Sequence, residues 1–238
     1  MNLPLSLRQS LKRLGRGAGE VLGVRRYAQP ALYEIDRKLE RHLDRDGGVF
    51  IEAGANDGVR QSNTYYFEKI RGWTGLLVEP VPELAAECRK NRRASVVREA
   101  ALVEREVAGA TVELHVAGLM STVAGALGDG AATAEHVAAG RAVQGLAETR
   151  TIRVPARTLS ALIDEAGLAG EIDLLSLDVE GAEEAALRGL DLRRHTPRFI
   201  CVEARDEAAI AAVLGERYRV AEVLTDVGTH RDVLYARR

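Results

Sequence analysis

The sequence is poor in the features that mark several large classes of protein. Only 4% of its residues are aromatic, which leaves few side chains on which the bases of a single-stranded nucleic acid could stack. The formal net charge is −2, so no excess of basic residues attracts nucleic acid. No apolar run reaches the roughly 20 residues that a membrane-spanning helix needs. These absences argue against a nucleic-acid-binding protein and against stable insertion into a membrane.

Cysteine is also scarce. Cys88 and Cys201 are the only two, and Cys201 lies inside an apolar run. An isolated cysteine in such a run is typically a small core residue rather than a metal ligand or a nucleophile. The scarcity suits a reducing compartment, and we therefore expect a cytoplasmic protein.

Residues 1–30 form a basic arm. Leucine alternates with arginine and lysine between Leu5 and Arg16, which is typical of an amphipathic helix. The arm lacks the continuous apolar core and the small-residue cleavage site of a signal peptide. Two interpretations stay open: a partly ordered helical arm, or a surface arm that touches an anionic partner or a membrane.

The remaining chain, residues 31–238, alternates between apolar strands and helical segments and reads as one domain. Leu32, Ile35, Leu39 and Leu43 share one apolar stripe, which predicts a helix over residues 31–44. The alternation that follows predicts an α/β domain with a parallel sheet and right-handed crossovers. We expect strands at 49–53, 75–79, 95–99, 172–178 and 199–203, helices at 63–70, 82–91, 158–166 and 206–214 and one ending at 187, and a terminal antiparallel pair at 218–223 and 233–235.

A stretch rich in glycine and alanine interrupts this alternation at about residues 117–150. An expected edge strand at 111–116 precedes it, a strand at 151–154 follows it, and a weak helix is expected within it at 135–143. A long insertion in a compact domain is usually a functional lid or has no fixed structure. We interpret this one as a lid that faces the substrate.

The first strand leads directly into a loop punctuated by Gly54 and Gly58. A strand, a glycine loop and a helix in this order build a nucleotide-sized pocket at the carboxyl edge of an α/β sheet. Gly54 would allow a tight turn and the close approach of a ligand to the backbone. The Glu-x-Gly-x-x-x-Gly spacing differs from the dinucleotide fingerprint and from the phosphate-binding P-loop.

Four of the expected strands end in an acidic residue: Glu52, Glu79, Asp178 and Glu203. Because the carboxyl ends of parallel strands meet at one edge of a sheet, we expect these side chains to lie close together. An acid at the end of the second strand is placed to accept hydrogen bonds from the ribose hydroxyls of a nucleoside. A solvated strand-end carboxylate is the alternative interpretation of Glu79.

Three blocks of the sequence resemble the FkbM family of S-adenosylmethionine-dependent methyltransferases. They are residues 50–58 with 62–64, residues 72–80, and residues 172–183 with the strand at 199–203. The resemblance extends from about Val49 to Tyr235 and leaves out the N-terminal arm and the insertion. Glu52 is a departure, because an aspartate is often found there.

The resemblance implies a Rossmann-like class I methyltransferase fold, with a seven-stranded, mostly parallel sheet and helices on both faces. It implies S-adenosylmethionine as cofactor, with Glu79 holding the ribose hydroxyls and Asp178 where the donor meets the acceptor. The acceptor it implies is a hydroxyl of a sugar or a secondary metabolite, on a small molecule or a glycan. The other predicted cofactor-binding residues are Glu52, Gly54, Ala55, Asn56, Asp57, Gly58 and Ser62 around the glycine loop, and Glu99 and Ala100 beside the adenine.

Two schemes for the chemistry stay open, because a hydroxyl acceptor must lose its proton. In the first, Asp178, with Glu180, orients or deprotonates the acceptor, and His230 in the last loop is a second candidate base. In the second, Asp178 and Glu203 share a divalent cation such as Mg²⁺. For His230 an exposed loop histidine is the alternative, and for Glu183 we prefer a favourable charge at a helix N-terminus.

Two broader questions also stay open in the sequence. A non-catalytic nucleoside-binding or scaffolding protein that keeps the fold is the alternative function. The oligomeric state is undetermined, with a homodimer as one alternative.

Overall fold

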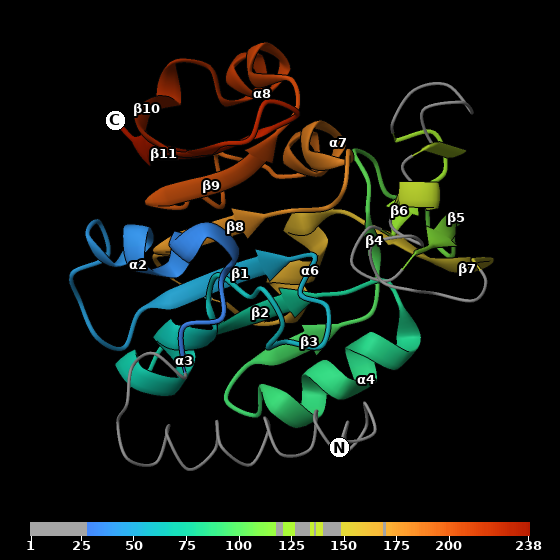
Figure 1. The fold of residues 1–238 in the computed structure, drawn as a ribbon, viewed down its shortest axis with the longest axis horizontal. Coiled ribbons are helices and arrows are strands. Elements are labelled where there is room, and N and C mark those ends of the chain that lie inside the picture. The colour runs from blue at the N-terminus through green and yellow to red at the C-terminus, as the bar shows by residue number, and fades with distance from the viewer. Residues whose placement is uncertain (1–27, 118–120, 127–133, 136, 140–148, 169) are drawn as a thin grey trace, which may run out of the picture.

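The structure, a computed structural model, describes residues 28–238 apart from 118–120, 127–133, 136, 140–148 and 169, and its centre is a seven-stranded sheet (Figure 1). The strand order is β10-β11-β9-β8-β1-β2-β3. Neighbouring strands are parallel except at β11, which runs antiparallel to both β9 and β10. The strands are β1 Val49–Ala53, β2 Thr74–Val78, β3 Val96–Arg98, β8 Leu174–Leu177, β9 Phe199–Ala204, β10 Tyr218–Asp226 and β11 Arg231–Arg237.

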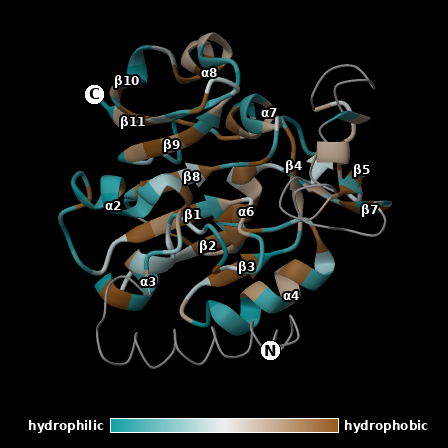
Figure 2. Cartoon of the chain, viewed as in Figure 1, coloured by the Kyte–Doolittle hydropathy of each residue, from teal (hydrophilic) through white to brown (hydrophobic). Residues whose placement is uncertain are grey.

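Helices cover both faces of this sheet. The helices α2 (Ile35–Glu40), α3 (Tyr65–Arg71) and α4 (Pro82–Asn91) pack against the face that carries Phe50. The helices α6 (Leu159–Glu165), α7 (Glu183–Arg188) and α8 (Glu207–Leu214) pack against the face that carries Ile51. Because successive side chains of a strand point to opposite faces, a central strand covered on both sides must be apolar throughout. The central strands are accordingly largely brown, or apolar, in Figure 2.

A second, four-stranded sheet lies beside the first and to its right in Figure 1. Its order is β4-β7-β5-β6, with β4 parallel to β7 and the other pairs antiparallel. The strands expected at 111–116 and 151–154 are present, but they pair with each other here, in a sheet that the sequence did not indicate. Its strands are β4 Ala101–Leu102, β5 Thr111–Val116, β6 Thr122–Val123 and β7 Arg150–Arg157.

The helix expected at residues 31–44 is shorter than predicted. A short 3-10 turn, η2 (Leu32–Glu34), comes first, and α2 begins only at Ile35 because Tyr33 and Glu34 have left-handed backbone angles (φ 52° and 57°). Ala31 forms an isolated β-bridge with Gln61 beside the glycine loop, so the chain is not helical at this residue. The predicted apolar stripe is therefore wrong at Leu32, which is 45% exposed.

The other expected elements are present with ends shifted by a few residues, and a second 3-10 turn, η4 (Gly215–Arg217), follows α8. The basic arm lies outside the described residues as far as residue 27, whereas Ala28 is fully buried. Within the insertion, residues 135 and 137–139 of the expected helix are described, and they are helical. The lid stays a prediction, because most of it lies outside the described residues. In the part of the chain that is described, no helix is long and apolar enough to cross a membrane.

Candidate active site

A cavity of about 450 Å³ opens at the carboxyl edge of the main sheet. This volume is within the range of about 300–1,000 Å³ that is typical of small-molecule sites. Leu102, Leu114 and Val123 give it an apolar wall, and all three come from the small sheet. Polar side chains line the rest: Asn56, Arg60, Gln61, Glu79, Ser121, Asp178, Glu180, Glu203, Arg205, Thr229 and His230.

Gly54 brings the glycine loop against the end of β8. Its φ is +83°, and a Cβ atom at this position would lie 1.8 Å from the carbonyl oxygen of Asp178. The Gly54 amide donates to the Val78 carbonyl oxygen at 3.0 Å, and the Asp178 amide donates to Ala53 at 3.2 Å. Only glycine satisfies both the backbone angle and the close approach.

Glu79 is a buried carboxylate on the cavity wall directly after β2. Its Oε2 accepts a hydrogen bond from the Asn56 amide at 2.8 Å, and its Oε1 accepts one from the Val81 amide at 2.9 Å. Burial raises the pKa of Glu79 to about 7, in spite of these two bonds. Each carboxylate oxygen has a second lone pair, so the group can still accept hydrogen bonds from a ligand.

Asp178 and Glu203 lie next to each other on neighbouring strands. The register pairs Leu177 with Val202, so the next residue of each chain segment is one of the two acids. Asp178 is exposed to solvent through the cavity. Partial desolvation of its carboxyl group, together with the Glu203 and Glu180 carboxylates, raises the pKa of Asp178 above its usual range. Burial and Glu180 also raise the pKa of Glu203.

Two basic side chains flank Glu203. Arg205 Nη2 lies 3.3 Å from Glu203 Oε1 and 2.9 Å from Glu180 Oε2. On the other side, His230 Nε2 lies 3.6 Å from Glu203 Oε2. His230 comes from the loop between β10 and β11, which closes over this edge of the sheet. Glu203 therefore holds an arginine and a histidine at the cavity wall.

The turn after β8 is held by hydrogen bonds from both sides. Glu183, the first residue of α7, accepts bonds through Oε1 from the amides of Val179 (2.9 Å) and Gly181 (3.1 Å). Thr122 Oγ1, in the small sheet, donates to the Glu180 carbonyl oxygen at 2.8 Å. Glu183 therefore stabilises the turn that precedes α7, and the favourable effect of its charge on the helix stays a prediction.

The family comparison agrees with this geometry. The profile of the methyltransferase FkbM domain matches residues 52–225. The chain belongs to the FkbM methyltransferase family. It is thus an S-adenosylmethionine-dependent methyltransferase, and its seven-stranded sheet with one reversed strand confirms the predicted class I fold.

Solved structures of methyltransferases are similar to this FkbM domain at low identity. The methyltransferase FkbM of Methylobacillus flagellatus is 13% identical with a TM-score of 0.46, over 81% of this chain and 44% of that one. A TehB-like methyltransferase of Corynebacterium glutamicum is 9% identical with a TM-score of 0.44, over 86% and 88%. Fibrillarin of Aeropyrum pernix, with natively bound S-adenosyl-L-methionine, is 13% identical with a TM-score of 0.44, over 86% and 76%. No curated protein matches in sequence.

The structure divides the predicted site residues of the FkbM domain into two groups. Eight line the cavity: Gly54, Asn56, Glu79, Ala100, Asp178, Glu180, Glu203 and His230. Six that were predicted to bind the cofactor do not line it: Glu52, Ala55, Asp57, Gly58, Ser62 and Glu99. The six contact the protein's own groups, and their direct contacts with the cofactor stay predictions.

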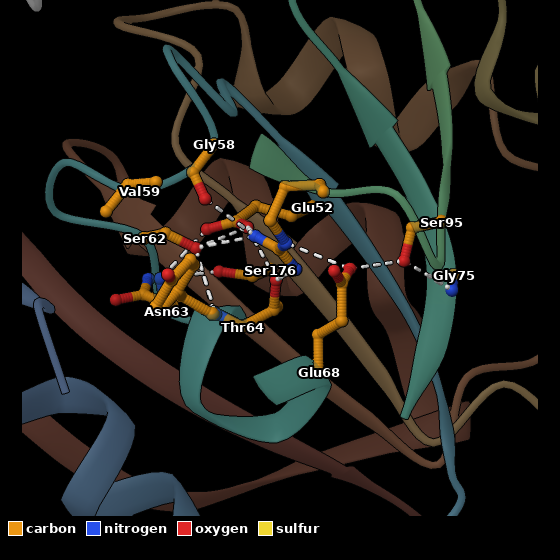
Figure 3. A network of polar contacts seen from close by, with 12 residues as sticks. Glu52, Gly58, Val59, Ser62, Asn63, Thr64, Glu68, Gly75, Ser95 and Ser176 are labelled. Atoms are coloured by element: carbon orange, nitrogen blue, oxygen red, sulfur yellow. Dashed lines mark hydrogen bonds and ion pairs between the residues drawn. The ribbon is translucent and has the colours of Figure 1, made fainter. Parts of the chain in front are cut away.

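Glu52 corrects the prediction that an acid ends the first strand. It lies inside β1, not at its end, on the sheet face that α3 covers, and it is buried there. Its carboxylate accepts hydrogen bonds from Ser62 Oγ (2.8 Å), the Asn63 amide (2.8 Å) and Thr64 Oγ1 (2.6 Å), as Figure 3 shows. The carboxylate thus orders the end of the glycine loop from beneath.

The other non-lining residues have local roles. Asp57 Oδ1 accepts bonds from the amides of Val59 and Arg60 and so shapes the loop. Ala55 is buried beneath the loop. Glu99 lies 3.7 Å from Arg89 Nη2, away from the cavity.

Sequence reasoning missed several residues that shape the site. Arg205 lines the cavity and stands two residues after a strand acid, which is a usable signal. Leu32 and Arg60 carry no signal, because an exposed leucine and a loop arginine are ordinary surface residues. Arg92 is fully buried, but its place in the basic run at the end of α4 is typical of solvated charges at a helix C-terminus.

Asp178 and Glu203 are the predicted ligands of a metal ion. In the described ranges, no group of three or more histidine, cysteine, aspartate or glutamate side chains is arranged to hold a metal ion. Asp178 and Glu203 by themselves would leave most of the coordination of Mg²⁺ to water or substrate.

Proposed function

We propose that this FkbM methyltransferase transfers the methyl group of S-adenosylmethionine to a hydroxyl group of a sugar or a secondary metabolite. The observation that supports this best is the arrangement of groups in one cavity. A buried carboxylate, Glu79, lies at one side, and a cluster of Asp178, Glu203 and His230 lies at the other. The first suits a ribose, and the second suits an acceptor that must lose a proton.

The cavity residues fit the cofactor. Glu79 retains lone pairs for the two ribose hydroxyls, and Gly54 lets a ligand approach the loop backbone. Ala100 and Leu102 supply an apolar surface for the adenine. Residues 54–56 would hold the methionine end, and Asp178 would stand where the methyl donor meets the acceptor.

When bound, S-adenosylmethionine supplies an activated methyl group on a sulfonium. A hydroxyl that takes up this methyl group would have to give up its proton, and S-adenosylhomocysteine would be left as the second product. Aligning the reacting atoms can contribute roughly 7–11 kcal/mol. Alignment therefore falls to the cavity walls, and proton removal to the cluster beside Asp178.

The residues of this cluster have different roles in the proposed reaction. Asp178 lies in the cavity beside the Glu203 and Glu180 carboxylates, where it can orient the acceptor hydroxyl through a hydrogen bond. His230 is held by Glu203 and faces the cavity, so it is the better candidate to accept the proton. Glu180, which is paired with Arg205, keeps that side of the cluster in place.

Mutation of the candidate base tests this scheme. With a hydroxylated acceptor identified from a panel of sugars, His230→Gln should lower kcat by about 10²–10⁴-fold and leave the affinity for S-adenosylhomocysteine unchanged. His115→Gln is the matched control, because His115 contacts Thr151 in the small sheet and does not line the cavity. Equal turnover of the wild type and His230→Gln would assign the base elsewhere, with Asp178→Asn as the next variant.

Chelation separates the two chemical schemes. If Asp178 and Glu203 hold Mg²⁺, excess EDTA should abolish turnover and added Mg²⁺ should restore it. Undiminished turnover in EDTA rules out the metal scheme.

Calorimetric titration addresses the cofactor itself. S-adenosylhomocysteine should bind with measurable heat, and the absence of heat would overturn the cofactor assignment. Binding without methyl transfer to any hydroxylated acceptor would favour the non-catalytic, nucleoside-binding alternative.

A further inference from the structure

Arg92 lies beneath the glycine loop and is fully buried. It is the residue directly after α4, and its guanidinium donates to groups on three different segments. The acceptors are Glu68 Oε2 (2.9 Å), Glu52 Oε2 (3.4 Å), the Gly58 carbonyl oxygen (3.0 Å), Ser62 Oγ (3.1 Å) and Thr64 Oγ1 (2.8 Å).

The acceptors of Arg92 are themselves connected, as Figure 3 shows. Ser62 Oγ donates to Glu52 and accepts from the Tyr65 amide at 3.0 Å. Asn63 Nδ2 donates to Ser176 Oγ at 3.0 Å, in β8. Ser176 stands two residues before Asp178, so one polar layer joins the glycine loop to the strand that leads to Asp178.

The charge and shape of Arg92 suit this place. Its positive charge is balanced by the buried carboxylates of Glu52 and Glu68, and removing one partner of such a pair is strongly unfavourable. The guanidinium also lies over the ring of Phe50, 5.1 Å from its centroid. A lysine has three donors on one nitrogen and cannot reproduce the planar fork.

A glycine at position 58 leaves room for the side chain of Arg92. A Cβ atom at Gly58 would lie 2.7 Å from Arg92 Cγ and 2.8 Å from Cys88 Sγ. The arginine stem occupies the space that a side chain at residue 58 would need. The φ of Gly58 is +78°, so its backbone angle and the space taken by Arg92 and Cys88 both favour glycine here.

We propose that Arg92 is the positioning residue of the glycine loop. It holds residues 58–64 through a carbonyl and two hydroxyl groups, and so sets where Gly54 and Asn56 stand in the cavity wall. Arg92 does not line the cavity and acts only through these neighbours. The inference rests on the proposed placement of S-adenosylmethionine against Gly54 and Asn56.

The test compares Arg92→Lys with Arg93→Lys. Arg93 is the next residue, is exposed, and within the described part of the chain donates to the Lys90 carbonyl oxygen alone, so the same substitution there is the matched control. Amide hydrogen exchange is measured over residues 56–63 without ligand, and the affinity for S-adenosylhomocysteine by calorimetry. In Arg92→Lys the loop amides should exchange faster, and the affinity should fall by about tenfold or more. Arg93→Lys should match the wild type.

Leu214→Ala distinguishes positioning from a general loss of stability. Leu214 is buried in α8, on the opposite face of the sheet, and its truncation destabilises the domain without touching the polar layer. Measured well below its midpoint temperature, Leu214→Ala should bind S-adenosylhomocysteine like the wild type. If Arg92→Lys does not fold, Ser62→Ala removes one acceptor of Arg92 and provides the same two measurements.

The outcomes separate this inference from the proposed function. A folded Arg92→Lys with wild-type loop exchange and wild-type affinity would overturn the positioning role, and so would Ser62→Ala with both unchanged. A wild type that does not bind S-adenosylhomocysteine would overturn the cofactor site instead, whatever the exchange data show.

Discussion

At Gly54 the glycine loop approaches the backbone of Asp178, directly after β8. Gly54→Ala adds a Cβ atom that would lie 1.8 Å from the Asp178 carbonyl oxygen, so β1 and β8 must separate at their ends. We expect this variant to lose S-adenosylhomocysteine binding in calorimetry. Gly72→Ala is the matched control, because Gly72 also has a positive φ (+66°) but no described residue within 4 Å of the added atom. Equal affinities of the two variants would contradict the proposed cofactor site.

Glu79 should make cofactor binding depend on pH. Its pKa is raised to about 7 by burial, and the ionised form is the better acceptor for ribose hydroxyls. Because the carboxylate is protonated below its pKa, affinity for S-adenosylhomocysteine should fall by about tenfold from pH 8 to pH 6. Glu79→Gln should bind more weakly and with a flatter pH profile.

The control for Glu79 is Glu83→Gln, which changes an exposed glutamate paired with Arg150 at the start of α4. It should keep the wild-type profile. A pH-independent affinity of the wild type would show that Glu79 does not contact the ligand as a carboxylate.

At the scale of elements, the first turn of α7 holds the turn that contains Asp178 and Glu180. Glu183→Ala removes the carboxylate that accepts from the amides of Val179 and Gly181, and should lower the free energy of unfolding by about 1–2 kcal/mol. Glu184→Ala removes only an exposed pair with Arg188 and should cost about 0.3–0.5 kcal/mol. Urea unfolding measures both, and equal losses would contradict the role given to Glu183.

At the scale of the whole molecule, the domain begins earlier than the predicted residue 31. Ala28 is fully buried, Ala31 pairs with Gln61, and Leu32 lines the cavity. Deletion of residues 1–27 should leave S-adenosylhomocysteine binding unchanged, whereas deletion of 1–34 should weaken it and lower the midpoint temperature. Weaker binding after the shorter deletion would support the alternative of an arm that contacts the site or a partner.

Much of the main sheet was predictable from sequence. Apolar runs of four to six residues at 49–53, 174–177 and 199–204 are typical of strands covered on both faces, and they alternate with amphipathic helices. The location of the cavity followed from the same pattern, because the carboxyl ends of parallel strands share one edge. The small sheet was not predictable, since β5 and β7 are far apart in the sequence and no local signal pairs them.

The sequence by itself determined that acids gather at one edge of an α/β sheet beside a glycine loop. Only the tertiary structure decided which of them faces the cavity. Glu79 follows its strand and opens to the cavity, whereas Glu52 lies within its strand, on the face that α3 covers, and binds Arg92. The physical reason is that a strand directs side chains to opposite faces, and what covers each face depends on helices from elsewhere in the chain.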